Sequence, residues 1–343
     1  RGLGDVYKRQ FTGFAADSLE LEDSNWTPGF RTEFERRRGY DLTPHLPDLW
    51  EALAPESAAI RQDFLETLSE LMLDGYFRRY TAWAHARGLK TIIQAHGTIA
   101  DPLAAYGAVD VPDVETMWPG SERQSVNLRS RRLGVSAAHI YGKPVITAES
   151  YTWLRMPRFL VTLELLKAAS DALYIDGVNH IKAHGYSSSP RGVGRPGWAF
   201  YASTLINHNQ TWWNHFPALA AYLGRMNYLM QSGEYVADLA LYHNLHDARA
   251  HWDTPRPEWL KDYIWRRPDR DPGMDAAALI AIRLRDCAQR LQDAGYGFDV
   301  VNDAALPRRL LIFYRTESVP LATLRKIRDW KIPVIAVGNL PGA

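Results

Sequence analysis

The chain has 343 residues, more than one ordinary domain, and 46% of them are hydrophobic, which is enough for a substantial core and leads us to expect two domains. Its 40 basic residues balance its 39 acidic residues without any block of like charge, so the composition argues against a nucleic-acid partner. The single cysteine, Cys287, excludes an internal disulfide framework, and no apolar run is long enough to predict a membrane span.

Both ends of the chain lead us to expect a fragment. Residues 1–10, RGLGDVYKRQ, contain no initiator methionine and resemble the adaptor-derived tails of shotgun-assembled reading frames. We therefore predict that they are a non-native tail and leave them out of the fold prediction. At the other end, the chain stops directly after a predicted strand.

The first part of the chain alternates between predicted strands and helices. FTGFAAD (11–17) has the composition of a strand, and apolar residues recur every three or four positions over 57–87, which predicts a long amphipathic helix ended by Gly88. Further strands are predicted at 89–97, 143–150 and 175–185, with helices at 123–142 and 158–174 between them. This alternation is typical of a parallel sheet with helical crossovers.

The positions of the polar residues favour one parallel-sheet architecture over another. A doubly wound sheet normally carries a glycine-rich first turn, yet no G-x-G-x-x-G follows a predicted strand, and GVGRPG (192–197) contains a proline. In a (β/α)8 barrel, functional residues come from the C-terminal ends of several strands. The residues in such positions are Asp17 to Glu20, Gln94 with His96, Glu149, and His180 with His184. We therefore predict an α/β fold in which residues 11–232 belong to a TIM-like barrel.

A change in composition near Gly233 predicts a second unit over residues 233–343. Strand-like segments at 236–244, 298–302, 309–314 and 332–338 alternate with predicted helices at 275–295 and 321–331. This series favours a flavodoxin-like α/β domain that is truncated by the end of the chain. The charged, proline-rich stretch 256–273 is predicted to be a surface excursion.

Three glutamates stand where catalytic carboxylates are expected. Glu20 follows the first predicted strand, Glu115 lies in VDVPDVE, and Glu149 closes the strand KPVITAES. Burial raises the pKa of a carboxyl at such an end and suits it to donate a proton, while a better solvated carboxylate stays ionised as a base. Two such groups facing one pocket make a glycosidase pair, although a single strand-end glutamate is about as often a helix cap or salt-bridge partner. Glu149 has no cation nearby in the sequence, which favours the catalytic role.

Histidine and tryptophan residues indicate sugar binding more than metal binding. His180 and His184 are four residues apart, but no H-E-x-x-H surrounds them, so zinc is not predicted. They either hydrogen-bond substrate hydroxyls or satisfy one another in a core. The chain has 12 Trp and 17 Tyr, whose faces stack on sugar rings, although any single Trp is more often a core or interface residue. No G-x-S-x-G supports a serine nucleophile.

A series of motifs resembles the α-L-rhamnosidases of glycoside hydrolase family 106. Residues 14–47 resemble that family's D-S-x-E, W-T-x-x-F and R-R-G-Y-D motifs. The other matching segments follow in order: QAHG (94–97), VDVPDVE (109–115), SAAHIYGKPVITAESYT (136–152), DGVNHIKAHGYSSSP (176–190) and TWWNHFPAL (211–219). The resemblance covers almost the whole chain from Phe11, and the joint order of the motifs makes it fairly specific.

The resemblance implies an incomplete (β/α)8 catalytic barrel followed by an accessory domain, and hydrolysis of terminal α-L-rhamnosyl groups of glycans with inversion. It assigns Glu20 as the general acid and Glu149 as the base that activates water. It also implies a calcium ion ligated by Glu115, and a periplasmic or secreted location. The sugar-binding candidates that it adds are Asp17, Gln94, His96, Trp118, His180, His184 and Trp213.

Two other interpretations stay open. A retaining glycosidase of the β-galactosidase type also has a flavodoxin-like domain after its barrel, and its carboxyl groups would lie about 5 Å apart rather than roughly 6.5–9.5 Å. A non-catalytic carbohydrate-binding relative would keep the aromatic pocket without turnover. Because members of family 106 carry earlier barrel strands that the resemblance does not cover here, we expect an open barrel with exposed sheet edges.

Overall fold

The computed structural model describes residues 12–19, 25–50, 53–115, 131–153, 159–250, 276–306, 308–338 and 341. The predicted tail 1–10 and the predicted surface excursion 256–273 lie outside these residues. The elements up to residue 231 are β1 (Gly13–Ala16), α2 (Phe30–Arg38), α3 (Ser57–Met72), α4 (Arg79–His85), β2 (Lys90–Ile93), α5 (Pro102–Gly107), β3 (Val111–Glu115), α7 (Arg131–Ile140), β4 (Thr147–Ser150), α8 (Leu163–Asp176), β5 (His180–Ala183) and α9 (Phe216–Gln231). Those that follow are β6 (Leu239–Tyr242), α10 (Leu245–Ala250), α12 (Ala276–Asp293), β7 (Phe298–Val301), β8 (Leu311–Tyr314), α13 (Leu321–Trp330) and β9 (Val334–Val337).

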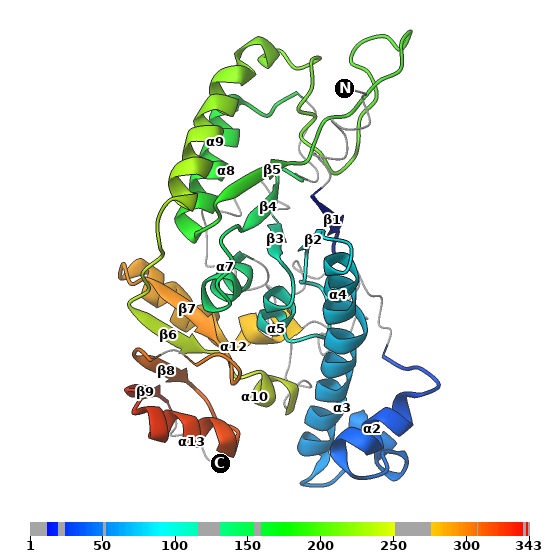
Figure 1. Ribbon diagram of the computed structural model, residues 1–343, viewed down its shortest axis with the longest axis vertical. Helices are drawn as coiled ribbons and strands as arrows, with labels where there is room; N and C mark the ends of the chain where they lie inside the picture. Colours follow the sequence, from blue (N-terminus) through cyan, green and yellow to red (C-terminus); the bar gives the residue numbers. More distant parts are fainter. Residues whose placement is uncertain are drawn as a thin grey trace.

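The first sheet is a curled set of five parallel strands (Figure 1). Its spatial order, β1-β2-β3-β4-β5, is the same as the order along the chain. A doubly wound sheet reverses direction at a switch point, whereas a barrel adds each strand beside the last. The predicted α/β fold is therefore confirmed, and the curled sheet is consistent with part of a TIM-like barrel.

The long helix predicted over 57–87 is present, with one irregular segment. Figure 1 shows α3 and α4 as one rod beside the sheet, and between them Leu73–Arg78 winds as a π-helix. Leu73 and Phe77 of this segment are buried in the main core. Gly88 follows the helix with a positive φ of 68°, a conformation that glycine adopts without strain, and the predicted end of the helix is confirmed.

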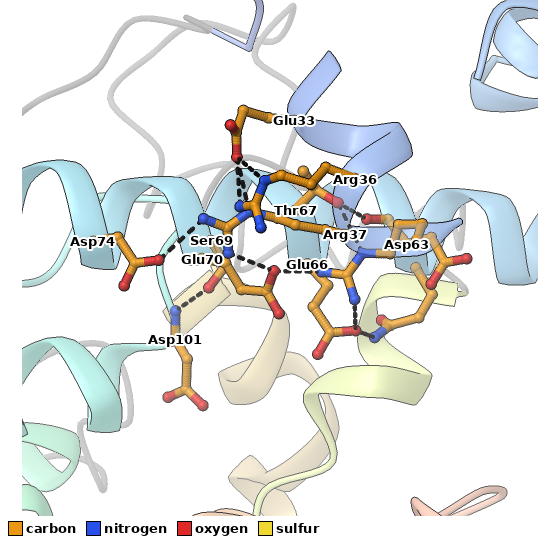
Figure 2. A network of polar contacts seen from close by, with 12 residues as sticks. Glu33, Arg36, Arg37, Asp63, Glu66, Thr67, Ser69, Glu70, Asp74 and Asp101 are labelled. Atoms are coloured by element: carbon orange, nitrogen blue, oxygen red, sulfur yellow. Dashed lines mark hydrogen bonds and ion pairs between the residues drawn. The ribbon is translucent and has the colours of Figure 1, made fainter. Parts of the chain in front are cut away.

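Helix α2, which the sequence analysis did not predict, is held on α3 by both apolar and charged contacts. Phe30 and Phe34 are buried, and the ring of Phe30 packs edge-on against Phe64 of α3 at 5.2 Å. Figure 2 shows Arg37 between acidic residues of α2 and the long helix, with Nη1 3.0 Å from Glu70 Oε2 and Nη2 3.0 Å from Asp74 Oδ2.

Strand β3 was likewise not predicted from the sequence. Proline has no backbone N–H and normally argues against a central strand, and Pro112 lies inside this one. The strand nevertheless pairs in parallel with β2 through Ile93↔Pro112 and with β4 through Asp113↔Thr147.

The second sheet has the order β7-β6-β8-β9, again all parallel. Its strands lie where the sequence predicted them, and a flavodoxin-like sheet begins with the same 2-1-3-4 order. The flavodoxin-like identity of this unit and the boundary between 232 and 233 stay predictions. None of the helices in the described part of the chain is both long and apolar enough to span a membrane.

Helix α7 joins the two sheets. Every residue from Arg131 to Ala138 is buried, because the helix packs on β3 on one side and on β7 on the other. Ser136 Oγ accepts a hydrogen bond from the Val300 backbone N–H at 2.9 Å, and His139 Nδ1 lies 2.8 Å from Asp299 Oδ1. A single cluster of buried apolar side chains continues from the first sheet into the second.

Asp101 adds a polar link between the same two parts. Its Oδ1 caps the N-terminus of α5, its Oδ2 accepts from Asn302 Nδ2 at 3.0 Å, and His243 Nε2 lies 3.5 Å away. Its backbone N–H donates to Ser69 Oγ of α3 at 2.8 Å, a contact drawn in Figure 2. Burial alone would raise the pKa of the Asp101 carboxyl, but His243 and Asn302 together hold this pKa below its ordinary value.

We expect Asp101→Asn to lower the free energy of unfolding at pH 7 by about 1 kcal/mol or more, because the carboxylate that accepts from Asn302 and lies beside His243 is lost. A carboxyl whose pKa is lower in the folded state stabilises the fold above the pKa of the unfolded chain, about 3.9, and this contribution disappears as the pH falls further. Urea unfolding of the variant and the wild type at several pH values measures this. A stability difference that stays constant from pH 7 to pH 3 would contradict the assignment.

Candidate active site

The parallel register aligns polar side chains in two rows across the strands, and the second row lies at or near their carboxyl ends. In the first row, Asp113 of β3 is paired with Thr147 of β4, which is paired with His180 of β5. The second row, two residues further along, contains Glu115, Glu149 and Lys182 in the same strands. Side chains two residues apart on a strand point to the same face of a sheet. Both rows therefore belong to one face.

Glu149 is buried in the second row, with 8% of its surface exposed. It is the third of the four residues of β4, all of which are buried, and this strand lies between β3 and β5. Its Oε2 accepts a hydrogen bond from Gln94 Nε2 and its Oε1 accepts one from Thr152 Oγ1, both at 2.6 Å. Both of these partners are donors, which suits a carboxylate that accepts rather than donates protons.

Asp113 lies beside this glutamate and was missed by the sequence analysis. Only 2% of the residue is exposed, and its carboxylate accepts from Thr147 Oγ1 and from Lys182 Nζ, both at 2.5 Å. A period-two pattern, D-x-E over 113–115 and T-x-E over 147–149, would have placed Asp113 and Thr147 on the same face as the glutamates. It was missed because no strand was predicted at β3.

His96 and Glu115 contact each other at the ends of β2 and β3. His96 is buried, with Nε2 2.9 Å from Glu115 Oε2 and Nδ1 3.1 Å from the Tyr106 hydroxyl. Calcium prefers a shell of six to eight oxygens. Among the residues that the structure describes, no group of three or more His, Cys, Asp or Glu is arranged to hold a metal ion. Calcium binding at Glu115 stays a prediction, and the described side chains do not by themselves form the site.

The two histidines of the β5 segment lie at opposite ends of the strand. His180 begins β5 and His184 follows its last residue, so about 13 Å of extended chain separates their Cα atoms and they do not form a pair. His184 Nδ1 donates to the Ala202 carbonyl oxygen at 2.9 Å and lies 3.7 Å from Glu149 Oε1. His184, partly exposed beside the buried Glu149, remains a candidate for contact with a ligand.

The remaining predicted site residues are spread around this centre or lie outside the described residues. Asp17 is exposed after β1, and its Oδ1 accepts from the Ser18 backbone N–H at 2.9 Å. Trp213 is partly buried, and its ring stacks on Phe216 at 5.3 Å. Glu20 and Trp118 lie outside the described residues. The pairing of Glu20 with Glu149 therefore stays a prediction.

Comparison with known proteins finds similarity to glycoside hydrolases. The family model for α-L-rhamnosidases, glycoside hydrolase family 106, matches residues 3–265. A protein from Formosa agariphila that carries the provisional name β-glucuronidase is 30% identical over 249 residues, which are 70% of this chain and 20% of that protein.

Two solved structures share the fold. A rhamnosidase from Novosphingobium sp. PP1Y superposes with a TM-score of 0.66 and 22% identity, over 95% of this chain and 31% of that one. A β-galactosidase from the haloarchaeon Halorubrum lacusprofundi superposes with a TM-score of 0.56 and 11% identity, over 95% of this chain and 52% of that one. The chain thus spans only part of each protein that it matches.

The contacts of Gln94 predict a difference between two substitutions of similar size. In Gln94→Glu, a third carboxylate faces Asp113 and Glu149, whereas Gln94→Met removes the donor without adding charge. We expect the glutamate variant to be less stable than the methionine variant by about 1–3 kcal/mol at pH 7. Thermal unfolding of both variants measures the difference. Equal stabilities would show that Gln94 does not lie between the two carboxylates.

Proposed function

We propose that this chain, which belongs to the α-L-rhamnosidase family known as glycoside hydrolase family 106, is part of an enzyme that hydrolyses terminal α-L-rhamnosyl groups of glycans. The observation that supports this proposal most is the environment of Glu149. It lies one residue before the carboxyl end of an inner strand of a parallel half-barrel, is buried, and accepts hydrogen bonds on both carboxylate oxygens. Catalytic side chains of barrel enzymes come from this end of the strands.

In the proposed reaction Glu149 is the general base. Each carboxylate oxygen has two acceptor positions, so Glu149 keeps acceptor capacity after binding Gln94 and Thr152. A water molecule held there loses a proton to Glu149 as its oxygen bonds to the anomeric carbon. The bond from that carbon to the leaving oxygen breaks, and the leaving oxygen keeps the electron pair and takes a proton from the general acid, which we assign to Glu20. Attack from the face opposite the leaving group inverts the anomeric centre.

A neutral rhamnosyl group fits the described strands better than a glucuronyl group. A glucuronide carries a carboxylate that needs a cationic partner in the pocket. Lys182 is the cation that β5 brings to this end of the sheet, and its ammonium group is already bound to Asp113 at 2.5 Å. This contact favours rhamnosidase activity over the activity suggested by the name of the Formosa relative.

Replacing the proposed base tests the proposal directly. In the enzyme that carries this chain, we expect Glu149→Gln to lower kcat on an aryl α-L-rhamnoside by about 10²-fold or more, because the water is no longer deprotonated. Glu164→Gln is the matched control, since Glu164 is exposed in the first turn of α8. Activity of Glu149→Gln equal to that of the control would exclude this role. Sugar binding by the wild type without any release of rhamnose would indicate a non-catalytic relative.

The configuration of the first product separates the two catalytic alternatives. With inversion, NMR during the first turnovers detects β-L-rhamnose before mutarotation. If the α anomer appears first, the mechanism is retaining, as in the alternative that the β-galactosidase type represents.

A further inference from the structure

Gln94 is held between two carboxylates. Its Nε2 lies 2.6 Å from Glu149 Oε2 and 3.3 Å from Asp113 Oδ2, and only 1% of the residue is exposed. A carboxamide nitrogen has two N–H donors, so each carboxylate receives one of them. Turning the amide over would place its oxygen against two acceptors. The two carboxylates together therefore require the Gln94 nitrogen between them, and Asp113 fixes the N–H that Glu149 does not use.

Asp113 is fixed in turn by residues of the neighbouring strands. Thr147 donates to its Oδ1, and the Lys182 ammonium group donates to its Oδ2. A buried carboxylate without a charged partner is costly, and the pairing with Lys182 offsets this cost. Lys182 itself is partly exposed, with 43% of its side chain accessible, so one end of the pair is hydrated. The contacts run from Lys182 through Asp113 and Gln94 to Glu149.

We propose that Asp113 and Lys182 are positioning residues that act on Glu149 through Gln94, an inference that rests on the proposed role of Glu149 as the base. They fix the orientation of the Gln94 amide, and the amide fixes Glu149 Oε2, while Thr152 fixes Oε1. The free acceptor positions of Glu149 are thereby aimed in one direction. A small displacement of a catalytic group lowers the rate of the chemical step more than it weakens substrate binding.

The first experiment uses Asp113→Asn in the enzyme that carries this chain. The asparagine amide is neutral and can rotate to present its own N–H, so the second N–H of Gln94 loses its fixed acceptor. We expect kcat on an aryl α-L-rhamnoside to fall by about 10-fold to 10²-fold, the scale on which misplacing a catalytic group acts, while KM stays nearly constant. Asp110→Asn is the matched control, because Asp110 precedes the same strand and accepts from Thr91 instead. An unchanged kcat for Asp113→Asn would overturn the proposal.

A double-mutant cycle separates positioning from a purely structural role. In a Glu149→Gln background, Asp113→Asn should cause little further loss, because it acts only through Glu149. The same fold-loss in both backgrounds would overturn the positioning role while leaving the proposed function intact. Full activity of Glu149→Gln alone would instead overturn the proposed role of Glu149 as the base, and this inference with it.

Lys182→Met provides a second route if Asp113→Asn does not fold. It removes the ammonium group from a partly exposed side chain, so little packing is lost. We expect a loss of kcat in the wild-type background and almost none in the Glu149→Gln background. A lower melting temperature with an unchanged kcat would show that Lys182 only stabilises the fold.

Discussion

The parallel register of β3, β4 and β5 is the constraint on which the candidate site depends. Because Asp113 is paired with Thr147 and Glu115 with Glu149, acidic side chains from separate strands share one face of the sheet. A slip of one residue would turn a whole strand over and direct its carboxylates toward the covering helices. Burial of β4 on both sides makes such a slip costly, since small residues that fit between neighbours would be exchanged for larger ones. Chemistry and packing therefore require the same register.

The alternation of strands and helices could be predicted from the sequence because period-two and 3.6-residue patterns are local. Irregular elements could not be predicted in this way. Strand β3 was not predicted because it contains Pro112, a residue that argues against a central strand. The strand forms because β2 and β4 pair with it on either side. The charged sequence of α2 offers few apolar residues, and its stability comes from Phe64 and the acidic residues of the long helix. Both β3 and α2 are therefore stabilised by tertiary contacts that a local sequence pattern does not reveal.

The candidate site shows the same division between local and long-range information. The positions of Glu149 and Gln94 near strand ends could be predicted from the sequence, because each follows a short apolar run, and His184 could be placed near the end of the next predicted strand. Their partners could not, since Gln94 and Glu149 are 55 residues apart and Asp113 and Lys182 are 69 apart. Gln94 was predicted to bind sugar, and the structure shows its amide nitrogen between two carboxylates. Only the packing of the strands reveals which polar residues act on substrate and which act on each other.

Helix α7 has a consequence for how such a protein can be divided or exchanged during evolution. Helix α7 packs against both sheets, on β3 of the first and on β7 of the second, so its buried surface forms part of both cores. Removing the second sheet would leave apolar surface and the polar groups of Ser136 and His139 facing solvent. Shuffling the two parts as separate modules would therefore require a new cover for this helix. The shared helix therefore couples the two sheets physically, even though their strand patterns suggest two units.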